Sequence, residues 1–185
     1  MTDINLKTGF LKEVKILKSP FIRKRDPAQE VSLIVIHGIS LPPGEFGGRH
    51  IDDLFLGRLN PNDDPYFETI AGLAVSAHLL IDRLGAITQY VSFYDQAMHA
   101  GQSEFLGKPR CNEFSIGIEL EGVDNIPYEV VQYRQLALVI RDLMQLFPKI
   151  NLERIVGHSE ISPGRKTDPG PAFDWELLRW NLLQS

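Results

Sequence analysis

The residues with the clearest potential for chemistry lie in one segment near the C-terminus, between Ile155 and Gly170. A short apolar run ends there at His158, and a loop rich in proline and glycine follows, with Lys166 and Asp168 two residues apart. Soluble folds often carry functional side chains on loops that a rigid scaffold holds in place. An imidazole, an ammonium and a carboxylate at the end of one buried strand predict a zinc site with an electrophilic lysine beside it.

A second histidine stands in an equivalent setting, because His37 ends the β-branched run 31–36 and precedes Gly38. A catalytic zinc ion typically has three protein ligands and one water. His37, His158 and Asp168 supply that number. A lone histidine of this kind is more often a satisfied, half-buried side chain. Two histidines in similar settings, with an aspartate in the loop after the second, favour the metal site.

The segment 114–122 alternates between two kinds of side chain. One face is apolar, and the other carries two small residues and two carboxylates, Ser115, Gly117, Glu119 and Glu121. That second face is typical of the floor of a polar pocket. Glu119 is the candidate general base, because burial raises the pKa of a carboxyl group toward neutral pH. A structural ion pair with an arginine explains Glu119 equally well, and Glu121 is the more structural or solvent-facing carboxylate of the two.

The remaining candidates are loop residues. Beside a metal, the Lys166 ammonium would stabilise the oxyanion of a tetrahedral intermediate, although an ordinary loop lysine is the simpler interpretation of Lys166 taken alone. Tyr66 and His99 are candidates for substrate contact, and either could instead be a surface or packing side chain. We place Asn112, in the polar segment after His99, in the same substrate-binding set.

The elements that must position these residues are predicted from hydrophobic periodicity and turn residues. Strands are expected at 14–17, 31–37, 74–81, 86–92, 114–122 and 154–158, with 74–81 and 86–92 forming a hairpin. Helices are expected at 51–59, 65–73, 127–147 and 174–183, the last with Asp174 as its N-cap. Strands and helices mix without strict alternation, which predicts an α/β fold around a central mixed β-sheet flanked by helices.

Chain length and composition predict one domain over residues 1–185. Within it we expect an N-terminal arm, 1–20, and a long loop region, 40–64, beside the active site. That loop region is too apolar to be a linker, so it should pack on the domain, as one wall of a cleft.

Composition also limits the partners and the compartment. The net charge of −5 lacks the basic footprint of a nucleic-acid binder. No export signal or membrane-spanning run is visible, so we expect a cytoplasmic monomer that contacts neither nucleic acid nor membrane. Cys111 is the single cysteine, which excludes an intramolecular disulfide and favours a small packing residue.

Five segments together resemble a known family: 36–38, 76–81, 99–101, 111–122 and 156–170. They are similar to the zinc-dependent N-acetylmuramoyl-L-alanine amidases, a family that also includes amidase-type phage lysozymes and peptidoglycan recognition proteins. The resemblance runs from about residue 20 to the C-terminus. The most specific block is Gly-His-Ser-Glu-Ile-Ser-Pro-Gly-Arg-Lys-Thr-Asp-Pro-Gly, at 157–170.

This resemblance implies an amidase/peptidoglycan-recognition-protein-like fold, Zn²⁺ on His37, His158 and Asp168, and catalytic roles for Glu119 and Lys166. It also implies that Asp168, rather than the cysteine of many relatives, is the third ligand. Met98 stands where the family often has tryptophan, which would alter a wall of the substrate cleft and leave the metal site untouched.

The expected reaction is hydrolysis of the amide between the lactyl group of 1,6-anhydro-N-acetylmuramic acid and L-alanine. The anhydro-sugar preference comes from the resemblance, while the expected compartment favours small soluble muropeptides as substrates. One alternative is a recognition module without turnover, which the complete ligand set disfavours. A second is a lytic enzyme acting on intact wall, which the net charge of −5 disfavours. A structural zinc site is disfavoured by Glu119 and Lys166 beside an open three-ligand set.

Overall fold

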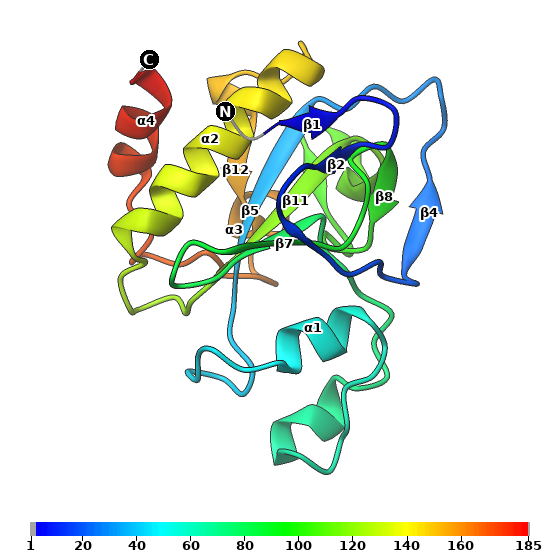
Figure 1. The fold of residues 1–185 in the computed structure, drawn as a ribbon, viewed down its shortest axis with the longest axis vertical. Coiled ribbons are helices and arrows are strands. Elements are labelled where there is room, and N and C mark those ends of the chain that lie inside the picture. The colour runs from blue at the N-terminus through cyan, green and yellow to red at the C-terminus, as the bar shows by residue number, and fades with distance from the viewer. Residues whose placement is uncertain (1–2, 185) are drawn as a thin grey trace.

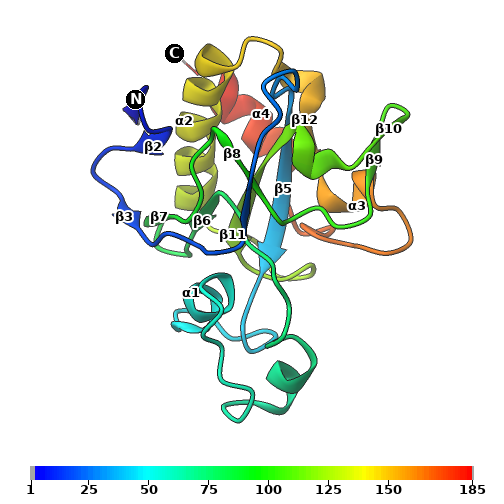
Figure 2. The same cartoon turned by 90° about the vertical axis from the view of Figure 1, so that its right-hand side faces the viewer.

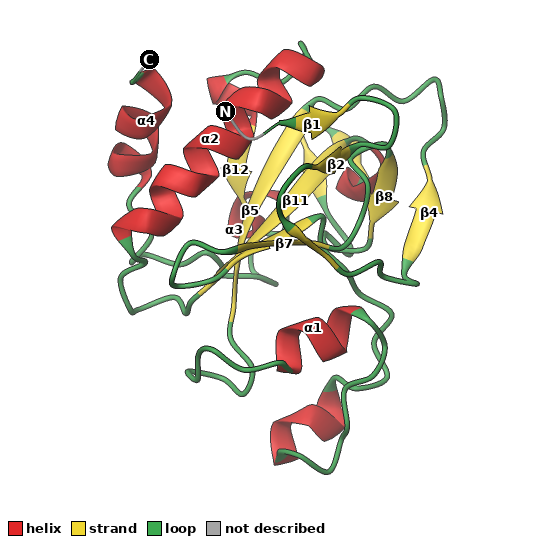
Figure 3. Ribbon diagram, in the orientation of Figure 1, coloured by secondary structure: helices red, strands yellow, loops and turns green. Residues whose placement is uncertain are grey.

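A six-stranded mixed sheet forms the centre of the computed structural model, which describes residues 3–184 (Figures 1 and 3). The spatial order is β12 (Ile155–Gly157), β5 (Leu33–Ile39), β11 (Ser115–Glu121), β6 (Leu79–Ile81), β7 (Ile87–Gln89) and β3 (Lys15–Ile16). The β6–β7 pair is antiparallel, and the other neighbours are parallel. The predicted α/β fold with a mixed sheet and the predicted hairpin are therefore confirmed.

The two central strands, β5 and β11, are buried because both of their faces are covered. Their register pairs His37 with Glu119. Side chains alternate between the two faces along a strand, and paired residues point to the same face. The metal-ligand candidate and the candidate base therefore project side by side from neighbouring strands, on the face that also carries Leu33 and Val35.

The opposite face is covered by α2 (Val130–Leu146), on which α4 (Trp175–Leu183) packs (Figure 2). The α2 side chains Leu136, Val139, Ile140 and Leu143 are fully buried in the same cluster as Ile116 and Ile118 of β11. Asp174 caps α4, because its Oδ1 accepts a bond of 2.8 Å from Leu177 N. Both helices and the cap agree with the prediction.

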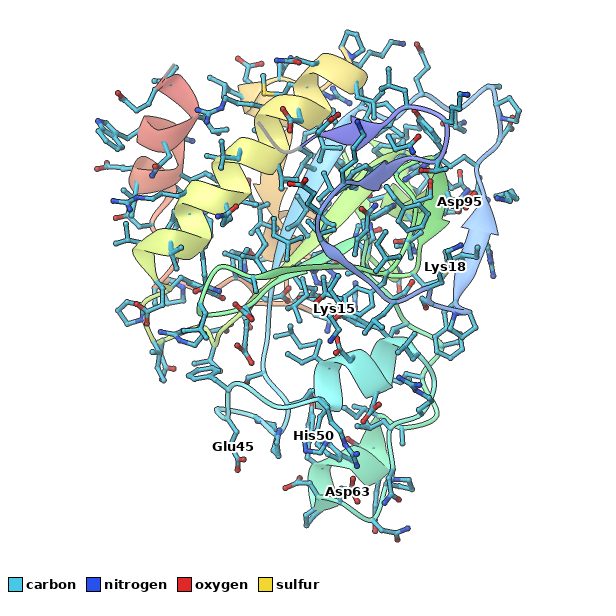
Figure 4. The ribbon with its side chains drawn as sticks, in the orientation of Figure 1. Lys15, Lys18, Glu45, His50, Asp63 and Asp95 are labelled. Carbon is cyan, nitrogen blue, oxygen red and sulfur yellow. The ribbon has the colours of Figure 1, made fainter. Side chains whose placement is uncertain are left out.

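A second apolar cluster lies below the sheet in Figures 1 and 2, around α1 (His50–Phe55) and the 3₁₀ helix η1 (Pro65–Thr69). Ile51, Leu54, Phe55 and Phe67 are its buried anchors. Lys15, labelled in Figure 4, lies above α1, and its Nζ lies 2.7 Å from Asp52 Oδ2 of that helix, which joins β3 to α1. The long segment after β5 thus packs against the rest of the domain through a cluster that also includes Leu80 of β6, Tyr90 and Val91.

The remaining elements are short. Three two-stranded pairs are β1 (Ile4–Asn5) with β2 (Phe10–Leu11), β4 (Ile22–Lys24) with β8 (Asp95–Ala97), and β9 (Glu104–Phe105) with β10 (Lys108–Pro109). The short helices are η2 (Cys111–Glu113), η3 (Leu152–Arg154) and α3 (His158–Ile161). Within residues 3–184, no helix is long and apolar enough to cross a membrane.

Several predicted boundaries are wrong. The strand expected at 86–92 keeps only Ile87–Gln89, and the helices expected at 51–59 and 65–73 end at Phe55 and Thr69. The strand expected at 74–81 keeps only Leu79–Ile81, because Ser76 turns toward other loops and bonds Met98 N and Phe21 O. His37 lies inside β5, which runs on to Ile39 as its pairing with β11 continues. His158 begins α3 instead of ending a strand, since the side chain of Glu160 accepts a bond from Gly157 N and starts a helical turn.

Candidate metal centre and active site

Three side chains converge at the ends of β5 and β12. His37 Nδ1 lies 3.0 Å from His158 Nδ1 and 3.2 Å from Asp168 Oδ2, and His158 Nδ1 lies 3.0 Å from the same Asp168 oxygen. Both histidines are almost fully buried, and the aspartate is partly buried. The residues predicted to bind metal are thus brought together, although 131 positions separate the first from the last.

Hydrogen bonding alone does not account for this triangle. A ring nitrogen has a single in-plane position, which holds either a proton or a lone pair, yet each Nδ1 faces two partners. A cation at the centre would serve all three atoms at once. Donor atoms about 2.0–2.1 Å from a tetrahedral zinc ion lie about 3.3 Å apart, which is close to the spacing observed. The donor set of two imidazoles and one carboxylate fits a catalytic zinc site with one position left open.

Local structure fixes each of the three donors. His37 is held in the central strand, and Gly157 of β12 pairs with Ile36 of β5, so His158 begins its helix beside His37. The loop that carries Asp168 is fastened back onto α3, because Ser159 N donates to Asp168 O at 3.0 Å. Tyr128 of the segment before α2 donates through its hydroxyl to Pro169 O at 2.9 Å. Sequence reasoning missed this support, for which the sequence carries no local signal.

The electrostatics suit metal binding, which needs neutral imidazoles and an ionised carboxylate. Burial lowers the pKa of His37 to about 4, although the neighbouring Asp168 carboxylate acts in the opposite direction. Burial opposes ionisation of Asp168, but its close interactions with the His158 and His37 rings outweigh burial and hold the pKa of the carboxyl below its ordinary value. At neutral pH, His37 is therefore uncharged and Asp168 carries its negative charge.

Glu119 lies next to this triangle, and burial raises its pKa well above the ordinary value. The negative charge of Asp168 raises that pKa further, while Lys166 lowers it. Glu119 Oε2 is buried without a hydrogen-bond partner among residues 3–184, and no arginine of that range forms an ion pair with it. The structural ion pair considered for Glu119 is therefore absent from the described chain. A partnerless carboxylate oxygen with a raised pKa is suited to proton transfer.

A cavity of about 730 Å³ opens over these groups. His37, Glu119, His158, Lys166 and Asp168 line its polar side. The opposite side comes from the α1–η1 segment through Leu54, Phe55, Tyr66, Ile70 and Leu73. Polar reacting groups on one wall and apolar side chains on the other are typical of a small-molecule site.

The residues predicted to contact substrate differ in their positions. Tyr66 lines the cavity and is 43% exposed, so its ring is accessible to a ligand. His99 also borders the cavity, but His37 Nε2 lies only 2.9 Å from its Nδ1. Asn112 is not among the residues that line the cavity. Its side-chain oxygen accepts bonds from the backbone amides of His99 and Ala100.

Two further residues have structural positions. Glu121 is 4% exposed and accepts bonds from Gly47 N and Arg83 N, so it is structural and the solvent-facing interpretation is wrong. Cys111 is buried in the apolar cluster on the metal-site face of the sheet, as a packing residue should be. Met98 lines the cavity, as expected for a residue on the cleft wall.

Comparison with known proteins adds independent information. The family model described as N-acetylmuramoyl-L-alanine amidase matches residues 27–171. The 1,6-anhydro-N-acetylmuramyl-L-alanine amidase AmpD of Haemophilus influenzae is 51% identical over 172 residues, which cover 93% of this chain and 94% of the relative. A crystal structure of an AmpD selenomethionine derivative superposes with a TM-score of 0.93 at 51% identity and covers 97% of this chain and 99% of its own.

A more distant structure was solved with a ligand. It is the complex of the Escherichia coli amidase AmiD with the substrate anhydro-N-acetylmuramic acid-L-Ala-D-γ-Glu-L-Lys. It superposes with a TM-score of 0.60 at 29% identity and covers 88% of this chain and 62% of its own.

Proposed function

This chain belongs to the N-acetylmuramoyl-L-alanine amidase family, and from that premise we propose that it is a 1,6-anhydro-N-acetylmuramyl-L-alanine amidase. It hydrolyses the amide that joins the lactyl group of the anhydro sugar to L-alanine. The observation that carries this proposal is the cavity in which the metal-ligand triangle, Glu119 and Lys166 meet. The high identity to AmpD over nearly the whole length of both chains supports the choice of substrate.

His37, His158 and Asp168 would hold Zn²⁺. When bound there, the ion supplies a Lewis acid that polarises a carbonyl and acidifies water. The support for zinc is the donor triangle and its spacing. The cavity, rather than a fourth protein ligand, lies in front of these three donors among the described residues.

Glu119 is the proposed general base and acid. Its raised pKa and its partnerless oxygen suit a carboxylate that takes a proton from the attacking water. The same carboxyl group then returns a proton to the amine of L-alanine as the amide breaks. The two transfers leave Glu119 in its starting state.

Lys166 is the proposed electrophile. It lies on the polar wall of the cavity, and its charge acts on both Glu119 and His37. A fixed ammonium would stabilise the negative charge that develops on the carbonyl oxygen. Tyr66, on the opposite wall, is the proposed contact to the substrate.

The proposal includes a cytoplasmic location, a soluble muropeptide substrate and a monomer. The net charge of −5 supports a small soluble substrate over the anionic polymer of the intact wall. The central six-stranded sheet, whose strands lie between residues 15 and 157, supports one amidase domain over residues 1–185.

The test combines metal analysis with turnover on one purified sample. We expect one zinc per chain and release of peptide from 1,6-anhydro-N-acetylmuramyl tripeptide, with little turnover of intact peptidoglycan. The Glu119→Ala variant should keep its zinc and lose turnover by orders of magnitude. Turnover of the polymer at an equal rate would place the chain among lytic amidases. Zinc binding without turnover of either substrate would contradict an enzymatic role.

A further inference from the structure

Both histidines of the metal triangle have a second ring nitrogen that points away from it. His37 Nε2 lies 2.9 Å from His99 Nδ1, and His158 Nε2 lies 3.3 Å from Ala100 O. These two partners are consecutive residues of one segment. We propose that the His99–Ala100 dipeptide is a shared outer support that fixes the tautomer and the ring orientation of both metal-binding histidines. The inference rests on the proposed metal site, and it assigns His99 a positioning role in place of substrate contact.

The donor and acceptor in each hydrogen bond between Ser115, His99 and His37 can be assigned from the carbonyl of Cys111. Cys111 O can only accept, so the hydroxyl of Ser115, at 2.6 Å, donates its single proton to it. Ser115 Oγ then accepts from His99 Nε2–H at 3.1 Å. His99 Nδ1 is therefore the acceptor of the His37 Nε2–H bond. His37 Nδ1 is left with a free lone pair, directed at the centre of the donor triangle.

The His158 side reaches the same result. Arg165 Nη2 is 3.4 Å from His158 Nε2, but it is also 2.7 Å from Ala100 O, 2.8 Å from Gln102 O and 2.7 Å from Ser162 Oγ. These three oxygens are closer than the histidine nitrogen and share the two protons of Arg165 Nη2, so neither proton is directed at His158 Nε2. Ala100 O, which has two lone pairs, remains the acceptor for His158 Nε2–H. His158 Nδ1 therefore also presents a lone pair toward the metal position.

The position of the dipeptide is fixed by its neighbours. Asn112 Oδ1 accepts from His99 N at 3.1 Å and from Ala100 N at 2.8 Å. Gly117 leaves room for the imidazole, because a Cβ there would lie 2.3 Å from His99 Cγ. The partly buried guanidinium of Arg25 donates to the carbonyls of residues 112, 113 and 115 at 2.7–3.1 Å and fixes the segment that carries both Asn112 and Ser115.

A support of this kind acts on metal affinity. Loss of an outer-shell partner of a metal-binding histidine typically lowers metal affinity by 10–100-fold. A residue that contacts substrate would instead alter KM and leave the affinity for zinc unchanged. The two roles for His99 therefore predict different measurements.

The experiment measures Zn²⁺ affinity of the full chain by competition with a chelator, for His99→Leu, His99→Gln and Ser115→Ala. We expect His99→Leu to bind zinc 10–100-fold more weakly. His99→Gln should retain most of the affinity, because its amide oxygen can accept from His37 Nε2–H. Ser115→Ala should fall between them. Ser92→Ala is the matched control, since Ser92 is a buried serine whose hydroxyl also donates to a backbone carbonyl, Thr8 O, at 2.7 Å.

A second readout needs no metal. In ¹⁵N NMR spectra of the metal-free protein, His37 and His158 should be Nε2–H tautomers, and Ser115→Ala should shift the His37 signals. Wild-type zinc affinity in His99→Leu, a change in KM alone, or an Nδ1–H tautomer of His37 would each overturn the proposal. Failure of the proposed function would look different, because the wild-type chain itself would then bind no zinc or release no peptide.

Discussion

The buried carboxyl group of Glu119 favours activity, but its ionisation lowers the stability of the fold. Burial raises its pKa in the folded chain above the ordinary value of 4.5. For a raised pKa, the stability contribution is fully present below the unfolded-state value and is lost as pH rises through the folded-state value. The metal-free wild type should therefore lose stability relative to Glu119→Gln as pH rises from 4.5. We expect the Tm difference between Glu119→Gln and the wild type to grow over that range.

The control for this prediction is Glu30→Gln, at an exposed carboxylate paired with Lys149. Its Tm difference from the wild type should change little with pH, because an exposed ion pair contributes little. The measurement is thermal unfolding in a chelating buffer between pH 4.5 and 8.5. A Tm difference for Glu119→Gln that stays constant with pH would show that Glu119 is not destabilised by its charge.

Lys166 offers a second test at the residue scale. Removal of one group that stabilises an oxyanion typically lowers kcat by about 10²–10³-fold. We expect Lys166→Met to show a loss of this size with zinc still bound, because the lysine is not one of the donors. Lys149→Met, at an exposed lysine outside the cavity, is the matched control. A rise in KM with kcat unchanged would instead show that Lys166 contributes to ground-state binding of the substrate.

At the scale of elements, α4 has a role separate from catalysis. Its N-cap, Asp174, bonds Leu177 N, and the backbone N–H of Asp174 donates to the Tyr133 hydroxyl of α2 at 2.7 Å. Replacement of an aspartate cap by alanine costs about 1 kcal/mol, or about 2–4 °C in Tm for a chain of this size. We expect Asp174→Ala to show this loss in thermal unfolding while its zinc affinity stays at the wild-type value.

Asn151→Ala is the comparison for Asp174→Ala. Asn151 caps only the three-residue η3 through Glu153 N, so its removal should cost less. Equal losses from the two caps would indicate that the contact between α4 and α2 contributes little to the effect of Asp174.

The elements that sequence could predict are those with strong periodicity. Helix α2 follows from the 3.6-residue spacing of its apolar side chains, and β5 and β11 follow from apolar runs of strand length. His37, His158 and Asp168 were predicted as one site because chemistry and family resemblance agreed on them. Residues 74–78 were placed in a strand wrongly, since polar bonds of Ser76 to distant loops override the local pattern.

The support behind the metal site was not predictable from spacing. His99, Ala100 and Asn112 meet because a side-chain amide reaches across a loop, and no periodicity encodes such a contact. Asn112 was predicted to bind substrate, whereas its observed bonds go to the backbone amides of His99 and Ala100. The need for glycine at position 117 follows only from the folded structure, in which a Cβ at this position would lie 2.3 Å from His99 Cγ.

At the scale of the whole molecule, the site lies between the central sheet and the apolar cluster around α1 and η1. The sheet supplies the reacting groups, and the α1–η1 cluster supplies the opposite wall of the cavity. The sheet side is rigid, because β5 and β11 pair over seven residues. Substrate chemistry is thus carried by the sheet side, while the shape of the cavity depends on how the segment after β5 packs.

The buried histidines make the whole metal-free fold sensitive to acid. Burial lowers the pKa of His37 to about 4 and that of His78 to about 3, and the pKa of His99 is also lowered well below 6.5. The unfolded chain therefore binds more protons than the folded chain when the pH is below 6.5. Stability is present above that value and is lost as pH falls from 6.5 toward 4.

We expect the Tm of the metal-free protein to fall steeply across this window. Each proton taken up on unfolding contributes about 1.4 kcal/mol per pH unit. Glu119 acts in the opposite direction because its pKa is raised, so the Tm of the Glu119→Gln variant should fall more steeply with decreasing pH.

His78 is the informative position for a single-residue test, because it accepts from Gly117 N and is not one of the metal donors. His78→Gln should reduce the slope by about one proton. A Tm independent of pH between 6.5 and 4 would contradict the neutral buried state of these histidines, on which metal binding at neutral pH depends.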